Sequence, residues 1–277
     1  MWYPSTMQKY LSLEKEVGQT PLQCVELYKE THPELQGVPM TYAGRLDPMA
    51  SGTLLILLGE ECKNQASYHN LDKEYTFEVL FGIGSDTADV LGRLTESSVL
   101  PEVTKEQLTA TCKELTGEVE LPYPHFSSKT VQGKPLHTWA LEGRIDEIEI
   151  PTKKSVIHSL SCTDLHTATR QDVYVYATTK IETIPPVTQL RKAIGNDFRR
   201  VDVRKDWEDF IENESFEDTF YIATFTCTAS SGTYMRTLAN VIAEKCGTTG
   251  LAYSIHRNKI GTYKKIPLLG GIWKKKF

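Results

Sequence analysis

The sequence of 277 residues lacks a long apolar run. Its longest uninterrupted apolar stretch covers residues 54–58, whereas a helix needs roughly 20 apolar residues to cross a bilayer. The N-terminal segment MWYPSTMQKY has no basic region followed by an apolar core, which a secretory signal peptide requires. These absences predict an intracellular, cytoplasmic protein without a membrane partner.

The sequence also lacks a spacing that is typical of metal sites or disulfide frameworks. No two of the six cysteines form a C-x-x-C pair, and the seven histidines show no ligand spacing near them. The cysteines stand at positions 24, 62, 112, 162, 227 and 246. We therefore expect reduced, scattered thiols and no metal site.

Charge of one sign does not dominate. The net charge is −5, which argues against a nucleic-acid coat over the whole surface but permits a basic groove on an acidic body. The hydrophobic fraction of 40% and the charged fraction of 24% are ordinary for a globular protein. The length allows one large domain or two small ones.

Strand and helix patterns alternate irregularly along the chain. Thr20 and Pro21 predict the start of a helix, because Thr is a good N-cap and Pro suits the first turn. Further strands are expected over residues 71–83, 155–183 and 220–230, and further helices over 104–116, 186–213 and after residue 234. This irregular mixture predicts an α+β fold.

One aspartate stands out in TYAGRLDPMASGTLLILLG, residues 41–59. Asp47 precedes Pro48, lies between two glycines, and is followed by what reads as a buried strand. The glycines allow unusual backbone angles or a close approach of another chain. Asp47 is either a functional carboxylate at the mouth of that strand or a loop residue that forms a turn.

An arginine and a tyrosine occur in settings that permit two interpretations each. Arg236 lies in the first turns of a helix after SSGTY, where a cation does not complement the helix dipole. It pairs with a carboxylate or phosphate, or it is a solvated helix residue. Tyr75, in DKEYTFEV, is either a site residue or ordinary packing at the start of a strand.

Together these stretches resemble a known family. The segments GRLDPMASGTLLILLGEECK, DKEYTFEVLFGIGSDTADVLG, QGKPLHTWA and SSGTYMRTLA follow the motif order of the TruB-type pseudouridine synthases, the tRNA pseudouridine-55 synthase family. The resemblance covers most of residues 10–162 and 219–262. It implies the pseudouridine synthase fold, a mixed, mostly antiparallel sheet with flanking helices and a central active-site cleft.

The resemblance implies three catalytic residues. Asp47 corresponds to the family's nucleophile, which acts on a uridine that is flipped out of its stack. Arg236 corresponds to the arginine that pairs with this aspartate. Tyr75 corresponds to the tyrosine that stacks on the target base and assists removal of the ring proton.

Three further residues are implied to bind substrate. Tyr234 matches a second tyrosine that contacts the substrate, and Ile255 stands where the family usually has a leucine under the base. Tyr42 stands where the family typically has histidine, so an aromatic face is kept and the imidazole is lost.

The resemblance also divides the chain. It implies a catalytic domain over residues 1–262 with an insertion at about 163–218, followed by a short basic tail over 263–277 and no full PUA-type domain. The insertion carries the segment QLRKAIGNDFRRVDVRK, residues 189–205, in which basic residues alternate with aspartates. It therefore either follows RNA phosphates or forms a solvated helical face, and the pattern favours the second.

The implied function is isomerisation of the T-loop uridine, position 55 of tRNA, to pseudouridine. It needs no cofactor or metal. Its expected partner is RNA, the tRNA T-arm, and the protein is expected to act as a monomer. Two alternatives stay open. One is the same chemistry at another RNA site, and the other is a non-catalytic protein that binds RNA or helps tRNA to fold.

Overall fold

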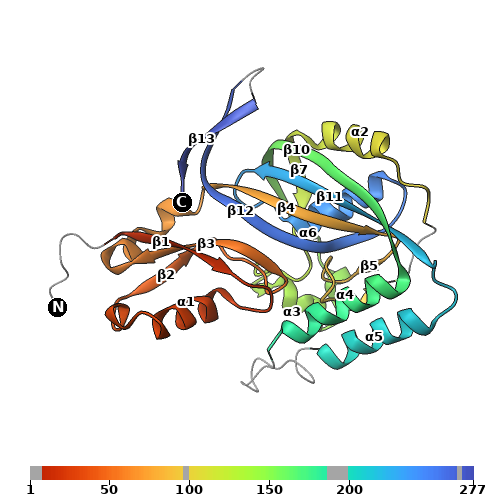
Figure 1. Ribbon diagram of the computed structural model, residues 1–277, viewed down its shortest axis with the longest axis horizontal. Helices are drawn as coiled ribbons and strands as arrows, with labels where there is room; N and C mark the ends of the chain where they lie inside the picture. The colour runs from red at the N-terminus through yellow and green to blue at the C-terminus, as the bar shows by residue number, and fades with distance from the viewer. Residues whose placement is uncertain (1–7, 96–99, 186–198, 267–269) are drawn as a thin grey trace.

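A computed structural model describes residues 8–95, 100–185, 199–266 and 270–277 (Figure 1). The large sheet consists of β1 (Tyr10–Lys15), β2 (Met40–Ala43), β3 (Ala50–Leu58), β4 (Asp72–Phe81), β7 (Gly117–Pro122), β10 (Thr152–Thr169), β11 (Thr219–Ala229), β12 (Gly250–Ile266) and β13 (Gly270–Lys276). The α-helices are α1 (Pro21–Glu30), α2 (Lys105–Leu115), α3 (Leu136–Leu141), α4 (Arg170–Thr183), α5 (Arg200–Glu212) and α6 (Met235–Lys245). The short elements are η1 (Pro33–Leu35), η2 (Gly59–Tyr68), β5 (Gly84–Ser85), β6 (Leu94–Thr95), β8 (Thr130–Val131), β9 (Lys134–Pro135) and η3 (Ile145–Glu147).

The sheet is mixed and mostly antiparallel. Its strands follow the order β1-β3-β12-β4-β11-β10-β7, with β2 also paired to β3 and β13 to β12. Among these pairings only β3 with β12 is parallel. The predicted α+β class with helices flanking such a sheet is confirmed. No helix in the described ranges has the length and apolar character needed to cross a membrane.

The apolar run of β3 is buried on both faces. Leu54, Ile56 and Leu58 pack with residues of α1 on one face. Leu55 and Leu57 pack with Tyr68 of η2 on the other. A strand covered on both sides needs apolar residues at consecutive positions, which explains the lack of alternation after Asp47.

The predicted N-terminal boundaries of two helices are confirmed. The Thr20 hydroxyl accepts from the amide of Gln23 at 3.2 Å, and the Gln23 side chain accepts from the amide of Thr20 at 2.8 Å. These reciprocal bonds form a capping box at the start of α1. At α2 the Thr104 hydroxyl accepts from the amide of Gln107.

The prediction of a strand over 170–183 is wrong, because these residues form α4. Their valines, tyrosines and threonines suggest a strand, but Thr169 and Asp172 form a capping box. Val173, Ala177 and Ile181 recur every fourth residue and are buried. Burial of this one helical face outweighs the weak β propensity of the segment.

The segment predicted as an insertion contains the end of β10 and all of α4 and α5. The end of β10 pairs with β11 up to Thr169–Thr219. The helices α4 and α5, which follow β10 and precede β11 in the chain, lie side by side (Figure 1). Residues 186–198 of the predicted helix fall outside the described ranges, and α5 begins at Arg200. Residues 263–266, expected in the tail, continue β12, and β13 pairs with that end.

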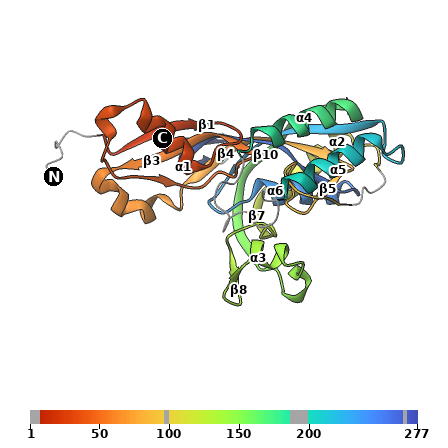
Figure 2. The ribbon, with the colours of Figure 1, turned by 90° about the horizontal axis from the view of Figure 1, so that it is seen from below.

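A segment with its own small core projects from the rest of the molecule. Figure 2 shows β8 and α3 extending away from the layer of the sheet. Leu136, Trp139 and Ile148 are buried there in a cluster separate from the main core. The helix α3 of this segment begins at Leu136 and contributes Trp139 to this cluster.

Candidate active site

The loop that carries Asp47 connects β2 to β3 and is fixed by a buried arginine. Arg257 of β12 is 1% exposed. Its Nε donates to the carbonyl of Thr53 at 2.7 Å, and its two terminal nitrogens donate to the carbonyls of Gly44 at 3.2 Å and Arg45 at 3.3 Å. The backbone on both sides of Asp47 is therefore held by one side chain, and no motif of the sequence pointed to Arg257.

Glycine is required where β3 meets β12. A Cβ on Gly52 would lie 2.4 Å from the carbonyl oxygen of Arg257, and Gly52 has a φ of +107°. Both observations exclude a larger residue without a backbone shift. The close approach that the glycine permits is the pairing of Gly52 with Arg257.

A second buried cation supports the other side of the loop. Lys15 is fully buried, and its Nζ donates to the carbonyls of Glu16 at 2.9 Å and Gln19 at 2.8 Å. The turn so formed presents the amide of Gly18 to the carbonyl of Pro48 at 2.8 Å. Burial lowers the pKa of Lys15 to about 8, although negative neighbours, including Asp47, oppose this shift.

The structure brings Arg236 to Asp47. The Nε of Arg236, in the first turn of α6, lies 2.9 Å from the Oδ2 of Asp47. That Nε–H forms no hydrogen bond within the described part of the chain, so the contact is an ion pair. The terminal nitrogens donate to the carbonyls of Thr87 at 2.8 Å and Phe126 at 3.2 Å. The Arg236 side chain is 6% exposed, and that of Asp47 is 46% exposed.

A second carboxylate shares this guanidinium. The Oδ2 of Asp89 lies 3.7 Å from the Nε of Arg236. The Oδ1 of Asp89 accepts from the Thr87 hydroxyl at 2.7 Å and from the amide of Leu91 at 3.0 Å. The sequence analysis missed Asp89, because SDTADVLG resembles an ordinary polar loop and nothing in it indicates burial.

Burial and charge act against each other in this cluster. Burial raises the pKa of Asp89, and the positive charge of Arg236 and the Thr87 hydroxyl oppose this shift only in part. For Arg236, burial alone lowers the pKa, but the Asp47 and Asp89 carboxylates outweigh it, so that the pKa is raised. The guanidinium is thus charged throughout the physiological pH range.

Tyr75 lies on β4 beside these groups. It is paired with Arg257 of β12 on one side and with Cys227 of β11 on the other. Burial raises the pKa of its phenol, and Arg257 opposes the shift. The tyrosine is therefore uncharged at neutral pH.

Two of the three residues expected to bind substrate lie close to this group. Tyr234 is the N-cap residue of α6, two positions before Arg236, and its ring centroid lies 5.6 Å from that of Tyr123. Ile255 of β12 is buried and pairs with Ala50, three residues after Asp47. Tyr42 of β2 packs instead with the cluster between β3 and α1, which includes Cys24 and Ile56.

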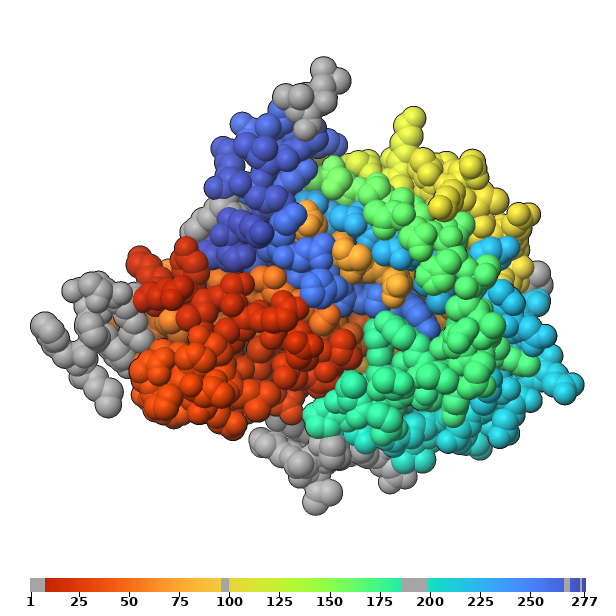
Figure 3. Space-filling view, viewed as in Figure 1, coloured from red at the N-terminus to blue at the C-terminus, as the bar shows by residue number. Residues whose placement is uncertain are grey.

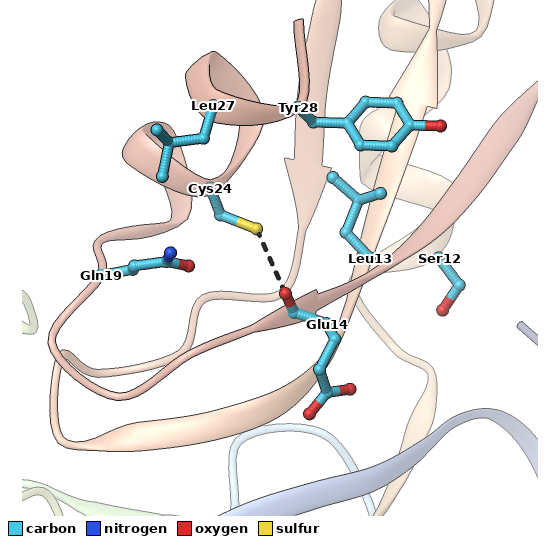
Figure 4. A pocket seen from close by; sticks show the side chains of 7 residues that line it. All are labelled: Ser12, Leu13, Glu14, Gln19, Cys24, Leu27 and Tyr28. Carbon is cyan, nitrogen blue, oxygen red and sulfur yellow. Dashed lines mark hydrogen bonds between the residues drawn. The ribbon is translucent and has the colours of Figure 1, made fainter. Parts of the chain in front are cut away.

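Two cavities are found at other places. One has a volume of about 390 Å³ and lies between α1 and β1, where the thiol of Cys24 faces the carbonyl of Glu14 at 3.7 Å (Figure 4). The other, of about 280 Å³, lies where α1 meets the end of α4. None of the six predicted site residues lines either cavity. The cleft expected in front of Asp47 therefore stays a prediction.

The carboxylates of this site do not belong to a metal centre in the described ranges. No group of three histidine, cysteine, aspartate or glutamate side chains is arranged there to hold a metal ion. Asp47 and Asp89, the two carboxylates of the site, both face the guanidinium of Arg236. The positive charge that both carboxylates face is thus supplied by a side chain of the protein.

Comparison with known proteins identifies the family. The family described as TruB family pseudouridylate synthase (N terminal domain) matches residues 35–183. A tRNA pseudouridine synthase B of Caldicellulosiruptor saccharolyticus is 30% identical over 258 residues, which cover 93% of this chain and 69% of the relative. One of Caldanaerobacter subterraneus is 36% identical over 119 residues, 43% of this chain and 41% of the relative.

A solved structure supports the fold. One chain in the crystal structure of a Cbf5–Nop10–Gar1 complex superposes with a TM-score of 0.52 at 14% identity, over 91% of this chain and 49% of that chain. At this identity the likeness concerns the fold alone. The matched sequence motifs and the level of identity show that this chain belongs to the TruB family of pseudouridylate synthases.

Proposed function

We propose that this protein converts a uridine of tRNA to pseudouridine, and that its target is the T-loop uridine at position 55. Membership of the TruB family supports the reaction, and relatives named tRNA pseudouridine synthase B support the class of RNA. The single observation that carries the proposal is the ion pair between the half-exposed Asp47 and the buried Arg236. A carboxylate that is paired with a buried cation and is half-exposed to solvent is suited to attack a bound nucleoside.

Asp47 is the nucleophile in this proposal. The target base leaves its stack, at a cost of a few kcal/mol. The carboxylate then attacks either C1′ of the ribose or the pyrimidine ring. The C1′–N1 bond breaks, the uracil turns, and C5 forms a new bond to C1′. The bond between the carboxylate and the nucleoside then breaks, which frees Asp47. The proton on C5 leaves to solvent and N1 gains a proton, so the net change is an isomerisation without oxidation or group transfer.

The surrounding residues bind and orient the base. Tyr75 stacks on the uracil and assists removal of the C5 proton, and its uncharged phenol suits an uncharged pyrimidine. Tyr234 contacts the nucleotide next to Arg236, and Ile255 forms the apolar floor under the base. Tyr42 contributes to the binding surface for the RNA that surrounds the flipped nucleotide, at some distance from the reacting atoms.

The proposal includes the expected setting of the reaction. The protein acts as a monomer in the cytoplasm, with the tRNA T-arm as its partner and without a metal or cofactor. Residues 1–262 supply the catalytic domain, with the insertion at about 163–218 and the basic segment 263–277 as its additions.

Tritium release tests this proposal. A T-loop transcript labelled with tritium at C5 of uridine loses its label to water only when C5 forms the new bond. We expect release with the wild type, and a rate lower by about 10⁴-fold or more with Asp47→Asn. Asp164→Asn is a matched control, because Asp164 on β10 is exposed to a similar degree, 58% for its side chain.

Each result has a defined meaning. Release by the wild type and Asp164→Asn but not by Asp47→Asn supports the proposal. Release by Asp47→Asn at the wild-type rate overturns the role of Asp47. Release from total RNA but not from the T-loop transcript overturns the choice of position 55 and leaves the chemistry.

A further inference from the structure

The helices α4 and α5 contact the segments that hold Asp47 and Arg236 in place. We infer that this helical pair positions the catalytic ion pair, with Arg199 and Asp206 as the positioning residues. The inference rests on the proposed function, since it assigns a role toward the residues of that reaction. It is based on contacts between this helical pair and the rest of the protein. The alternating charges of the sequence, which favoured a solvated helical face, did not predict these contacts.

The first contact joins α5 to the loop between β5 and β6. Asp206 accepts from the Nε of Arg93 at 2.6 Å and from its Nη2 at 2.9 Å, and it also accepts from the amide of Leu94 at 2.9 Å. The two bonds to the guanidinium fix the orientation of the Arg93 side chain, and the third bond, from the amide of Leu94, fixes the backbone there. Trp207, which is fully buried, donates to the carbonyl of Val90 at 3.2 Å.

This loop also carries two partners of Arg236. The carbonyl of Thr87 accepts from its Nη1 at 2.8 Å, and the carboxylate of Asp89 lies 3.7 Å from its Nε. The bonds from α5 therefore hold the loop on the C-terminal side of the two residues that contact the catalytic guanidinium.

The second contact is made by Arg199, directly before α5. Its Nη2 lies 2.6 Å from the Oδ2 of Asp86, and its guanidinium lies 4.7 Å from the ring centroid of Phe126. The carbonyl of Phe126 accepts from the Nη2 of Arg236. Arg199 has a φ of +67°, a conformation that non-glycine residues adopt only where their surroundings hold them. The Arg199 side chain thus contacts Phe126 and the residue before Thr87, and these two segments supply the carbonyls that accept from Arg236.

The third contact lies at the end of α4 and reaches the Asp47 side. Gly18 lies against Thr183, because a Cβ on Gly18 would be 2.3 Å from the carbonyl oxygen of Thr183. The amide of Gly18 donates to the carbonyl of Pro48, the residue after Asp47. Figure 3 shows the N-terminal segment and α4 meeting on the surface of the molecule. The helical pair therefore contacts segments that hold both members of the ion pair.

Several charged residues of this segment pair with other parts of the protein, whereas Asp202 and Lys205 are exposed to solvent. Of the basic and acidic residues in the predicted charged face, Arg199 and Asp206 bind the β5–β6 loop, and Arg204 pairs with Glu182 of α4. The prediction of a solvated face is wrong for these residues. Arg191, Lys192 and Asp197 of the same segment lie outside the described ranges.

The test separates chemistry from RNA binding. Asp206→Asn and Arg199→Met are compared with Glu182→Gln, which removes an ion pair between α4 and α5 that does not touch the β5–β6 loop. With enzyme in excess over labelled T-loop transcript, we expect the tritium-release rate to fall about 10- to 100-fold in the first two, as expected when reacting groups are displaced by about 1 Å. The Kd for the transcript should stay within about twofold of the wild type, since the RNA contacts are unchanged. Glu182→Gln should keep the wild-type rate.

Two further measurements distinguish positioning from loss of structure. Arg199→Lys keeps the charge opposite Asp86, so we expect it to recover much of the rate that Arg199→Met loses. Hydrogen exchange at the amide of Leu94, measured without RNA, should accelerate in Asp206→Asn and not in Glu182→Gln, because that amide donates to Asp206.

The outcomes that overturn the inference differ from those that overturn the proposed function. Wild-type rates in both variants, or equal losses in Glu182→Gln, overturn the positioning role. A raised Kd with an unchanged rate assigns these residues to RNA binding and also overturns it. Absence of tritium release by the wild type overturns the proposed function itself.

Discussion

The guanidinium of Arg236 lies 2.9 Å from the carboxylate of Asp47 and also contacts the carboxylate of Asp89 at 3.7 Å. One cation is thus shared by two anions of different exposure. The Asp89 side chain is 7% exposed, so its charge depends on Arg236, whereas Asp47 also reaches water. Arg236 therefore has both a structural and a catalytic role in the proposed mechanism, and substitutions can separate the two.

Replacing Arg236 by methionine should destabilise the protein strongly. Arg236→Met leaves the buried Asp89 carboxylate without its cation, and removal of one partner of a buried pair costs about 3–5 kcal/mol. Urea unfolding at pH 7 measures this loss. The double variant Arg236→Met/Asp89→Asn should recover part of the free energy of unfolding, because it removes the orphaned charge, yet it should not recover tritium release. Equal stability of the single and double variants would contradict this account.

Substitutions of Tyr75 should separate stacking from proton removal. Tyr75→Phe keeps the ring, so we expect RNA affinity close to that of the wild type and a rate of tritium release lower by roughly 10²- to 10⁴-fold, the usual contribution of an acid–base group. Tyr75→Leu should lose the stacking as well and weaken RNA binding by roughly 1–3 kcal/mol. Filter binding and single-turnover release measure the two effects. A full wild-type rate in Tyr75→Phe would assign the residue to stacking alone.

Local signals in the sequence predicted most helices and strands, but they did not predict contacts between residues distant in the sequence. Thr20 and Thr104 identified helix starts, because a cap and its partner lie three residues apart. The segment 170–183 was misassigned, because its buried face depends on which sheet it packs against. Arg257 and Asp89 were missed for a related reason. The carbonyls that Arg257 binds and the guanidinium that faces Asp89 are distant in the sequence, and such partners leave no local pattern.

Two glycines with positive φ should respond differently to alanine. Gly52→Ala forces a Cβ to 2.4 Å from the Arg257 carbonyl, whereas Gly37 has a φ of +76° with nothing within 4 Å of the added Cβ. Gly37→Ala should cost only about 1–2 kcal/mol of backbone strain. Gly52→Ala should cost more, since β3 and β12 must also separate. Thermal or urea unfolding of the two variants gives the difference, and equal losses would show that the close approach is relieved without cost. The greater loss in Gly52→Ala should be accompanied by a loss of activity, because the shift displaces the strand that follows the Asp47 loop.

Lys180 of α4 should make the free energy of unfolding vary with pH in the alkaline range. Its Nζ donates to the carbonyl of Tyr253 at 2.9 Å, and burial lowers its pKa from 10.5 to about 8, against the opposing charges of Glu78 and Asp89. Between these two values the unfolded chain binds a proton that the folded protein has released. The free energy of unfolding therefore rises with pH across this window, by about 1.4 kcal/mol per pH unit for this group. Methionine has a similar length and no charge, so Lys180→Met removes this contribution.

The stability of Lys180→Met relative to the wild type should consequently fall by roughly 3 kcal/mol between pH 7.5 and 10.5. Loss of the bond to Tyr253 adds an offset that does not vary with pH. Urea unfolding at several pH values measures the difference, with Lys205→Met as the control for general effects of alkali, because Lys205 lies exposed on α5. If the two variants differ from the wild type by amounts that change with pH in parallel, the slope does not arise from Lys180. If only Lys180→Met loses the rise of the unfolding free energy with pH, this rise comes from Lys180. The charged ammonium then destabilises the folded protein, and its deprotonation removes this destabilisation.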